Sequence, residues 1–201
     1  MNPLNSILGT IVSGFVLALI ISFAISGSMH ATPVAWTIWL HVMAGITWIG
    51  LLYYFNFVQV PAVGKAVADA NSGGPGPAAI NKYVAPRALL WFRWAAVVTW
   101  LTGAAALMKL GIFADAFLLA ENARVIGIGA WLGTIMLFNV WVLIWPNQKK
   151  ILGLTATPAS AEEIAKAKKV ALMASRTNTL LSIPMLLAMI ASPFHTGGLL
   201  F

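Results

Sequence analysis

The sequence predicts an all-α membrane protein, a polytopic bundle of five transmembrane helices forming a single domain over residues 1–201. Of its 201 residues, 60% are hydrophobic and only 8% are charged, and the mean hydropathy is +0.88. Water-soluble domains normally carry about 25% charged residues. Five segments also run for twenty or more residues with almost no acidic or basic side chain. Each is long enough, as a helix, to cross ~30 Å of hydrocarbon. These observations exclude a soluble globular fold.

The five spans are expected, in chain order, at residues 4–26, 34–60, 88–113, 123–145 and 171–192. The first lacks a basic leading region and a small-residue cleavage site, so we expect a retained helix and not a signal peptide. Between the second and third spans, Gly and Pro residues predict an irregular loop over Gly64–Pro86. Between the fourth and fifth, Ser160-x-x-Glu163 is typical of a capping box and predicts a helix that continues into the fifth span.

The net charge of +7 arises from 12 Lys and Arg against 5 Asp and Glu. The basic residues lie mainly in two connections between apolar spans, so topology explains them better than nucleic-acid binding does. Nine flank one side of the bundle and two the other, and the positive-inside rule makes the richer side cytoplasmic. We therefore expect a bacterial inner-membrane protein with a cytoplasmic N-terminus and a periplasmic C-terminus. The nine are Lys65, Lys82, Arg87, Lys149, Lys150, Lys166, Lys168, Lys169 and Arg176, and the two are Lys109 and Arg124.

The chain contains no Cys, which excludes disulfides, thiolate metal sites, iron–sulfur clusters and covalent haem attachment through thioethers. In the predicted topology all three His lie toward the outer side: His30 in a loop, His41 about two turns into the second span, and His195 just after the fifth. Two imidazoles on separate helices at similar depth are what axial ligation of a b-type haem needs. We therefore predict haem b with His41 and His195 as metal ligands, and interpret His30 as a solvated loop residue.

Two residues that follow His41 belong to the same predicted cofactor site. Gly45 and Trp48 lie on the helical stripe of His41, and Gly45 would let a flat ring lie close to the backbone. Met185 and Met189 on the fifth span are alternative second ligands. The competing interpretation is that His41 only forms a hydrogen bond to a neighbouring loop or helix, and that Gly45 serves helix packing.

A second set of polar side chains gathers toward the predicted cytoplasmic side, on four helices. Arg93 is the most informative, because it lies about 9 Å into the third span and no span contains an acidic residue that could neutralise it. Its partners would be amide carbonyls, an anionic lipid or an anionic ligand. Two interpretations stay open: Arg93 snorkels to the inner headgroups, or the set binds a planar or anionic substrate such as a quinone or a purine. The candidate substrate-binding residues are Asn56, Gln59, Arg93, Asn139, Arg176 and Asn178.

The second span as a whole resembles a known family. The stretch from Leu40 to Gly50, continued from Tyr53 to Pro61, is similar to the His-x-x-x-Gly-Ile-x-Trp-Ile-Gly helix of the membrane domain of PuuD-type urate hydroxylases. The segments 145–149 and 175–185 are similar to later parts of that domain. The resemblance extends from the second span to the end of the chain.

This resemblance implies a membrane protein that feeds electrons to a c-type cytochrome, with urate oxidation as the activity attributed to the family. Fuller members carry more spans and a C-terminal cytochrome c domain. Because this chain has no Cys, we expect the cytochrome, or a larger membrane complex, to be a separate partner. The second span also resembles, more distantly, that of HemJ-type protoporphyrinogen oxidases, which are linked to haem. Three function classes remain open: an enzyme acting on a small heterocycle, an electron-transfer subunit, and a non-catalytic accessory subunit of a larger membrane complex.

Overall fold

The computed structural model describes residues 2–26 and 32–191, and within these ranges the chain is helical and contains no strand. The elements are the 3-10 turns η1 (Pro3–Asn5) and η4 (Glu121–Ala123), the π-helical segments η2 (Phe55–Gln59), η3 (Ile80–Val84) and η5 (Asn139–Ile144), and the α-helices α1 (Ile7–Ser26), α2 (Pro33–Tyr54), α3 (Val60–Ala70), α4 (Ala85–Lys109), α5 (Phe113–Phe117), α6 (Arg124–Phe138), α7 (Trp145–Ile151) and α8 (Ala161–Ala191). The chain forms two compact units, Met1–Trp36 and Thr37–Phe201. We refer to the second unit as the bundle.

Several elements join end to end, so that the described residues contain five helical segments long and apolar enough to cross a membrane. This result confirms the predicted all-α class and the expected number of spans. The segments are Ile7–Ile25, Pro33–Ala70, Ile80–Lys109, Glu121–Ile151 and Ala161–Ala191.

The irregular loop predicted over Gly64–Pro86 is mostly wrong. Helix α3 continues through Gly64 to Ala70, and the chain is helical again from residue 78, so that only residues 71–77 are non-helical. Within that short connection Gly73 and Gly76 have φ values of 87° and 67°, which residues with a β-carbon rarely adopt. The second span therefore runs beyond its predicted end, to residue 70. The fourth span also runs beyond its predicted end, to residue 151.

Three prolines are accommodated by π-helical segments. A proline ring clashes with the carbonyl four residues earlier in an α-helix, and for each of these prolines that carbonyl lies inside a π-helical segment. The residue before each proline donates its N–H to the carbonyl five residues back, which widens the turn. The helices therefore continue where Pro content alone predicts a break. The prolines are Pro61, Pro86 and Pro146.

Helix α4 ends earlier than predicted, at Lys109 and not near residue 113. Gly111 has a φ of 73°. The N–H of Ile112 donates to Leu107 O at 3.0 Å, and the N–H of Gly111 donates to Met108 O at 3.1 Å. This pair of hydrogen bonds is a Schellman motif, and it turns the chain from α4 toward α5.

Helix α8 begins with the capping box that the sequence predicts. The N–H of Ser160 donates to Glu163 Oε2 at 2.8 Å, and the N–H of Glu163 donates to Ser160 Oγ at 3.2 Å. The helix then runs for 31 residues, from Ala161 to Ala191. The predicted extension of the fifth span toward the connecting segment is confirmed.

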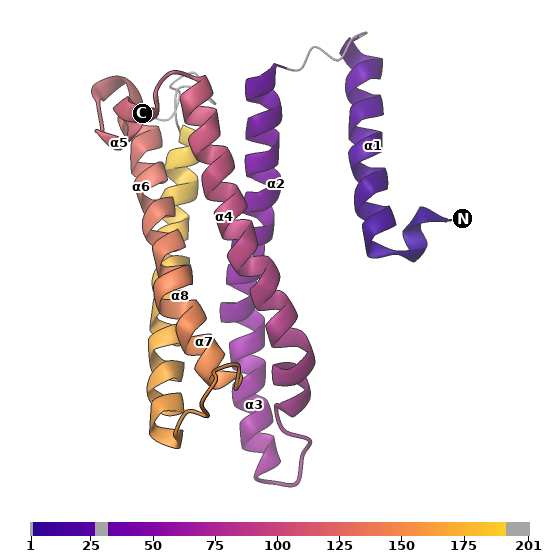
Figure 1. Cartoon of the computed structure of the whole chain (residues 1–201), viewed down its shortest axis with the longest axis vertical. Coiled ribbons are helices and arrows are strands. Elements are labelled where there is room, and N and C mark those ends of the chain that lie inside the picture. Colours follow the sequence, from indigo (N-terminus) through magenta and orange to yellow (C-terminus); the bar gives the residue numbers. More distant parts are fainter. Residues whose placement is uncertain (1, 27–31, 192–201) are drawn as a thin grey trace. The chain divides into compact units, whose positions relative to one another are not determined.

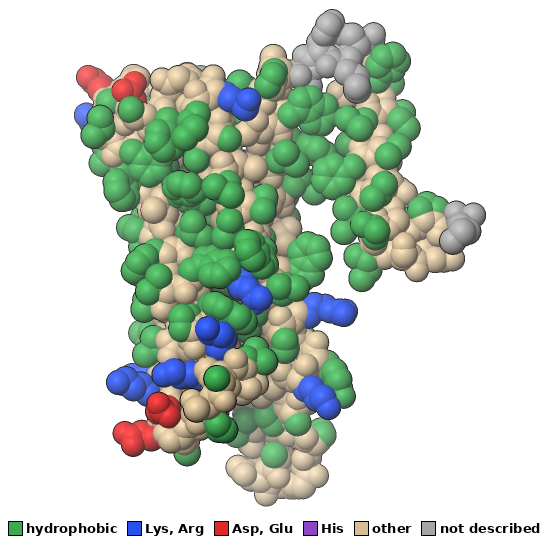
Figure 2. Space-filling model, in the orientation of Figure 1, with side chains coloured by type: hydrophobic (Ala, Val, Ile, Leu, Met, Phe, Trp, Pro, Cys, Tyr) green, Lys and Arg blue, Asp and Glu red, His purple; other side chains and the backbone are tan. Residues whose placement is uncertain are grey.

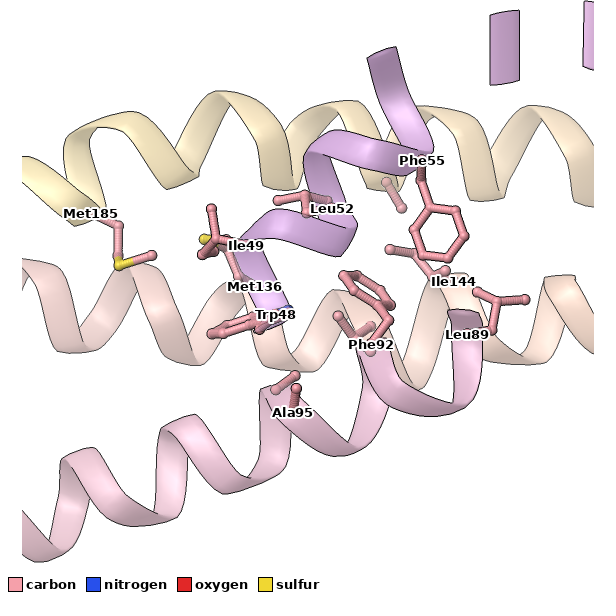
Figure 3. Close-up of a cluster of buried hydrophobic side chains, with 13 residues drawn as sticks. Trp48, Ile49, Leu52, Phe55, Leu89, Phe92, Ala95, Met136, Ile144 and Met185 are labelled. Atoms are coloured by element: carbon pink, nitrogen blue, oxygen red, sulfur yellow. The ribbon is translucent and has the colours of Figure 1, made fainter. Parts of the chain in front are cut away.

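The core of the bundle is a cluster of apolar side chains, drawn as sticks in Figure 3, which come from η2, η5 and the helices labelled α2, α4, α6 and α8 in Figure 1. Trp48, Leu52, Phe92 and Met136 are at most 2% exposed. Phe55 of η2 packs edge-on against Phe92 of α4, with ring centroids 5.4 Å apart. The contact between Phe55 and Phe92 joins the second span to the third.

Charged side chains lie toward the ends of the bundle. In Figure 2 most Lys and Arg side chains lie over the lower half of the bundle, both around α7 and the start of α8 and over α3 and the start of α4, while hydrophobic side chains cover much of the upper half of the same face. A surface of this kind, apolar over much of one half and basic over the other, is typical of a membrane protein with positively charged loops on one side.

Candidate functional site

His41 on α2 is held by a hydrogen bond to α4. Its Nδ1 lies 2.8 Å from the carbonyl oxygen of Thr99. A carbonyl can only accept, so Nδ1 carries the proton and, in the neutral ring, Nε2 carries the lone pair. Histidines that ligate metals usually donate their other ring N–H to such an acceptor, which sets the tautomer and the ring orientation. The Thr99 carbonyl therefore fixes the Nδ1–H tautomer of a neutral His41 ring.

The imidazole of His41 lies against Gly103 of α4. A β-carbon at position 103 would lie 2.8 Å from His41 Cε1 and 2.9 Å from Nδ1, closer than real β-carbons approach, so any other residue there would require the His41 ring to shift. Gly45, the position expected to seat a flat ring, faces the methyl group of Thr99 instead, with ordinary contact space for a β-carbon (3.8 Å). The glycine that lies close to the His41 ring is therefore Gly103 of α4, and not Gly45 of α2 as the sequence suggested.

The other predicted cofactor residues lie in different surroundings. Trp48 is 2% exposed, and its indole Nε1 has no hydrogen-bond partner among the described residues. Met185 belongs to the same core cluster as Trp48. The side chain of Met189 lies near Gly129, where a β-carbon would be 3.1 Å from Met189 Cε. His30 and His195 lie outside the described residues.

Two of the predicted polar residues meet in the interior of the bundle. Asn139 Nδ2 of η5 donates to Asn178 Oδ1 of α8 at 2.8 Å, and Asn178 Nδ2 donates to Met136 O at 3.0 Å. Asn178 is fully buried, and Asn139 is 8% exposed. This amide pair joins the fourth span to the fifth.

Asn56 reaches the same helix from η2. Its Nδ2 donates to Leu52 O at 2.9 Å and to Ser175 Oγ of α8 at 2.8 Å. About one turn before Asn56, and two turns beyond Ser175 on α8, the hydroxyls of Tyr53 and Ser182 are 2.9 Å apart. Ser175, Asn178 and Ser182 therefore form a polar stripe along α8, and partners from α2, η2 and η5 converge on it.

Two amide oxygens in this region lack donors. Asn56 Oδ1 and Gln59 Oε1 are both buried, and neither has a hydrogen-bond partner among the described residues. An unpaired buried acceptor costs about 1–3 kcal/mol. Both oxygens belong to η2, and π-helical segments occur frequently at functional sites.

The remaining members of the predicted set do not join the asparagines. The guanidinium carbon of Arg93 lies 3.8 Å from the centre of the Trp145 ring. Within the described part of the chain, no hydrogen bond connects Arg93 to an amide side chain. Arg176 is exposed. Of the predicted set, Asn56 and Asn139 both donate to side chains of α8, Asn56 to Ser175 and Asn139 to Asn178.

The sequence interpretation missed Thr99, Gly103, Ser175 and Ser182, which are common residue types in apolar helices. One internal signal, however, marks the asparagines. Trp48-Ile49-Gly50 precedes Phe55-Asn56, and Trp131-Leu132-Gly133 precedes Phe138-Asn139, with identical spacing from Trp to Asn. That repeated pattern would have identified Asn56 and Asn139 as corresponding positions of two spans.

A family model described as Urate oxidase N-terminal matches residues 29–126 and 110–197. Comparisons with curated proteins and with solved structures give no significant match. The two family matches together contain His41, Gly103 and the polar stripe of α8, so all of the geometry described above lies within the matched part of the chain.

Proposed function

Because the chain belongs to the Urate oxidase N-terminal family, we propose that it is an integral membrane redox protein. In this proposal it binds a b-type haem through His41 and passes electrons to a c-type cytochrome or a quinone. The observation that carries the proposal is the 2.8 Å contact from His41 Nδ1 to Thr99 O. This contact fixes the Nδ1–H tautomer, in which Nε2 is the ring nitrogen that would bind a haem iron. The absence of Cys requires that such a haem be held without thioether bonds.

A bound haem would supply one-electron redox chemistry. Thr99 sets the tautomer of His41, and Gly103 gives the ring its place on α4. His195 is the proposed second ligand, and Met185 or Met189 of α8 are the alternatives.

Substitutions at the His41 contact test the haem proposal. In protein purified from haem-replete cells, we expect a reduced-minus-oxidised spectrum of b type, which His41→Ala abolishes. Gly103→Ala should weaken or shift the spectrum, because its β-carbon would displace the ring. Gly50→Ala, whose β-carbon meets nothing within 4 Å, is the matched control and should leave the spectrum unchanged.

Two results would contradict haem ligation by His41: a wild-type protein without a Soret band, or a Soret band that His41→Ala leaves unchanged. In the second case His41 has a structural role, and its loss should cost about 1–3 kcal/mol of stability. A colourless protein that copurifies with a larger complex would support a non-catalytic accessory subunit, the alternative function.

We further propose that a small heterocyclic substrate or a quinone binds near the polar stripe of α8. The buried acceptors Asn56 Oδ1 and Gln59 Oε1, which lack donors, support this placement because they would pair with N–H or O–H groups of a ligand. Asn139 and Asn178 would shape the wall of such a site. Arg93 and Arg176, which make other contacts or face outward, would lie outside it.

The proposed location is the bacterial inner membrane, with the basic end of the bundle in the cytoplasm. Single cysteines at Ser28 and Ser72 in this Cys-free chain can be treated with an impermeant maleimide in intact cells. We expect Ser28→Cys to be labelled and Ser72→Cys to react only after the cells are permeabilised. The reverse pattern would invert the orientation.

A further inference from the structure

Two cations approach one indole ring at the basic end of the bundle. Arg93 Cζ of α4 lies 3.8 Å from the centre of the Trp145 ring, and Lys149 Nζ of α7 lies 5.9 Å from the same centre. Both distances are within the range of a cation–π interaction. Two like charges directed at one ring repel each other, however, unless an anion neutralises them.

The described residues contain no carboxylate paired with either cation. The acids of the chain are few, and two of them have other roles: Glu163 caps α8, and Asp115 accepts a hydrogen bond from Asn122. Both cationic side chains are half-buried, so water solvates them only partly. The donors of the Arg93 guanidinium are thus available for an anion from outside the chain.

Three tryptophans, Trp94, Trp141 and Trp145, lie next to this pair of cations. Trp141 and Trp145 precede Lys149 at four-residue intervals, and the two indoles contact neighbouring residues of α4. Trp94 packs edge-on against Trp141, with ring centroids 5.4 Å apart. The guanidinium of Arg93 lies over the ring of Trp145. Trp94 remains 52% exposed, so apolar surface lies directly beside the cations.

This combination matches the chemistry of a phospholipid. A guanidinium forms paired hydrogen bonds with phosphate oxygens, and an ammonium adds a point charge. Exposed tryptophans are typical of the level at which headgroups meet acyl chains. A free anion would use the cations but would gain nothing from the exposed apolar surface.

We propose that Arg93 and Lys149, with the Trp141–Trp145 face, bind the phosphate group of an anionic phospholipid. The proposal relies on the membrane integration proposed above and is independent of haem. In this arrangement the phosphate lies between the guanidinium and the ammonium, and an acyl chain covers the exposed ring of Trp94. The lipid would join α4 to α7, the two helices that contribute the cations.

Native mass spectrometry of the delipidated full chain in neutral detergent tests the site. Titration with phosphatidylglycerol should show one tightly bound lipid, and phosphatidylcholine should bind at least about tenfold more weakly. Arg93→Gln and Lys149→Gln should each reduce phosphatidylglycerol affinity about tenfold. Arg93→Lys should give a smaller loss of affinity, because lysine keeps the positive charge but lacks the planar pair of N–H donors of the guanidinium. Lys166→Gln, which removes an exposed charge of α8, is the matched control and should bind as the wild type does.

Three outcomes would overturn the proposal. Equal losses for Lys166→Gln and Arg93→Gln would mean diffuse charge attraction. Displacement of the lipid by millimolar inorganic phosphate would identify a site for a soluble anion. Equal affinity for phosphatidylglycerol and phosphatidylcholine would show that the negative charge of the lipid does not contribute to binding.

Helix content measured by circular dichroism identifies a misfolded Arg93 variant, and Lys149→Gln then tests the site separately. A failed haem test leaves each of these readouts unchanged.

Discussion

Replacing Asn178 with leucine is expected to lower the free energy of unfolding by about 2–4 kcal/mol. Asn178 is fully buried. It accepts a hydrogen bond from Asn139 Nδ2 and donates one to Met136 O. Leucine would leave the buried Nδ2 of Asn139 without its acceptor. Met136 O would lose one donor and keep the backbone N–H of Asn139. The measurement is equilibrium unfolding in mixed detergent micelles, followed by circular dichroism.

Asn147→Leu is the matched control for that substitution. Among the described residues, Asn147 Nδ2 donates to Leu143 O of its own helical segment alone, at 2.7 Å, so its loss should cost less than about 1 kcal/mol. The double variant Asn139→Leu/Asn178→Leu should recover part of the single-variant loss, because the Asn139 amide is then no longer unpaired. Similar losses for Asn178→Leu and Asn147→Leu would show that the interhelical pair adds no stability.

Gly127→Ala is the second substitution with a large expected effect, a loss of about 2–3 kcal/mol from overpacking. A β-carbon on Gly127 of α6 would overlap the carbonyl oxygen of Ala116, and it would lie 3.0 Å from Leu119 Cδ2. The obstacle is backbone, so a rotamer change cannot relieve it. Ala116 also belongs to the small apolar cluster that holds the end of α4, α5 and the start of α6 together. Unfolding in mixed micelles measures the loss.

Gly133→Ala tests whether the Gly127 effect is specific. A β-carbon at Gly133 meets no atom within 4 Å, so alanine should be neutral or should stabilise the helix by up to about 1 kcal/mol. The small-residue motif Gly129-x-x-x-Gly133 would assign both of its glycines to packing. In the structure only Gly129 contacts α8 closely, through Ala188 and Met189. Equal losses for Gly127→Ala and Gly133→Ala would contradict the packing described here.

The spans could be located from the sequence because hydropathy and length belong to each segment by itself. The capping box of Ser160 and Glu163 was equally readable, because both hydrogen bonds are local. The loop predicted over Gly64–Pro86 was mostly wrong because the prediction used the local Gly and Pro content alone. Pro content predicts a break, but a π-helical segment before the proline removes the clash and lets the helix continue.

Site residues could be predicted only in part. Histidine and asparagine in apolar helices are conspicuous because their burial is costly, and this directed attention to His41, Asn56, Asn139 and Asn178. Their partners were not conspicuous. The Thr99 carbonyl is a backbone atom, which any residue type supplies, and glycine and serine occur throughout membrane helices for packing.

The sequence by itself determined the all-α class, the five apolar segments and the start of α8. These features depend on residues close together in the chain and on the preference of apolar side chains for lipid over water. Only the tertiary structure decided that His41 meets Gly103, that Asn139 pairs with Asn178, and that Arg93 lies over Trp145. Those contacts depend on the rotation and crossing of each helix against its neighbours. Packing between distant segments sets that rotation, and helical periodicity within one segment does not specify which neighbour its polar residues will face.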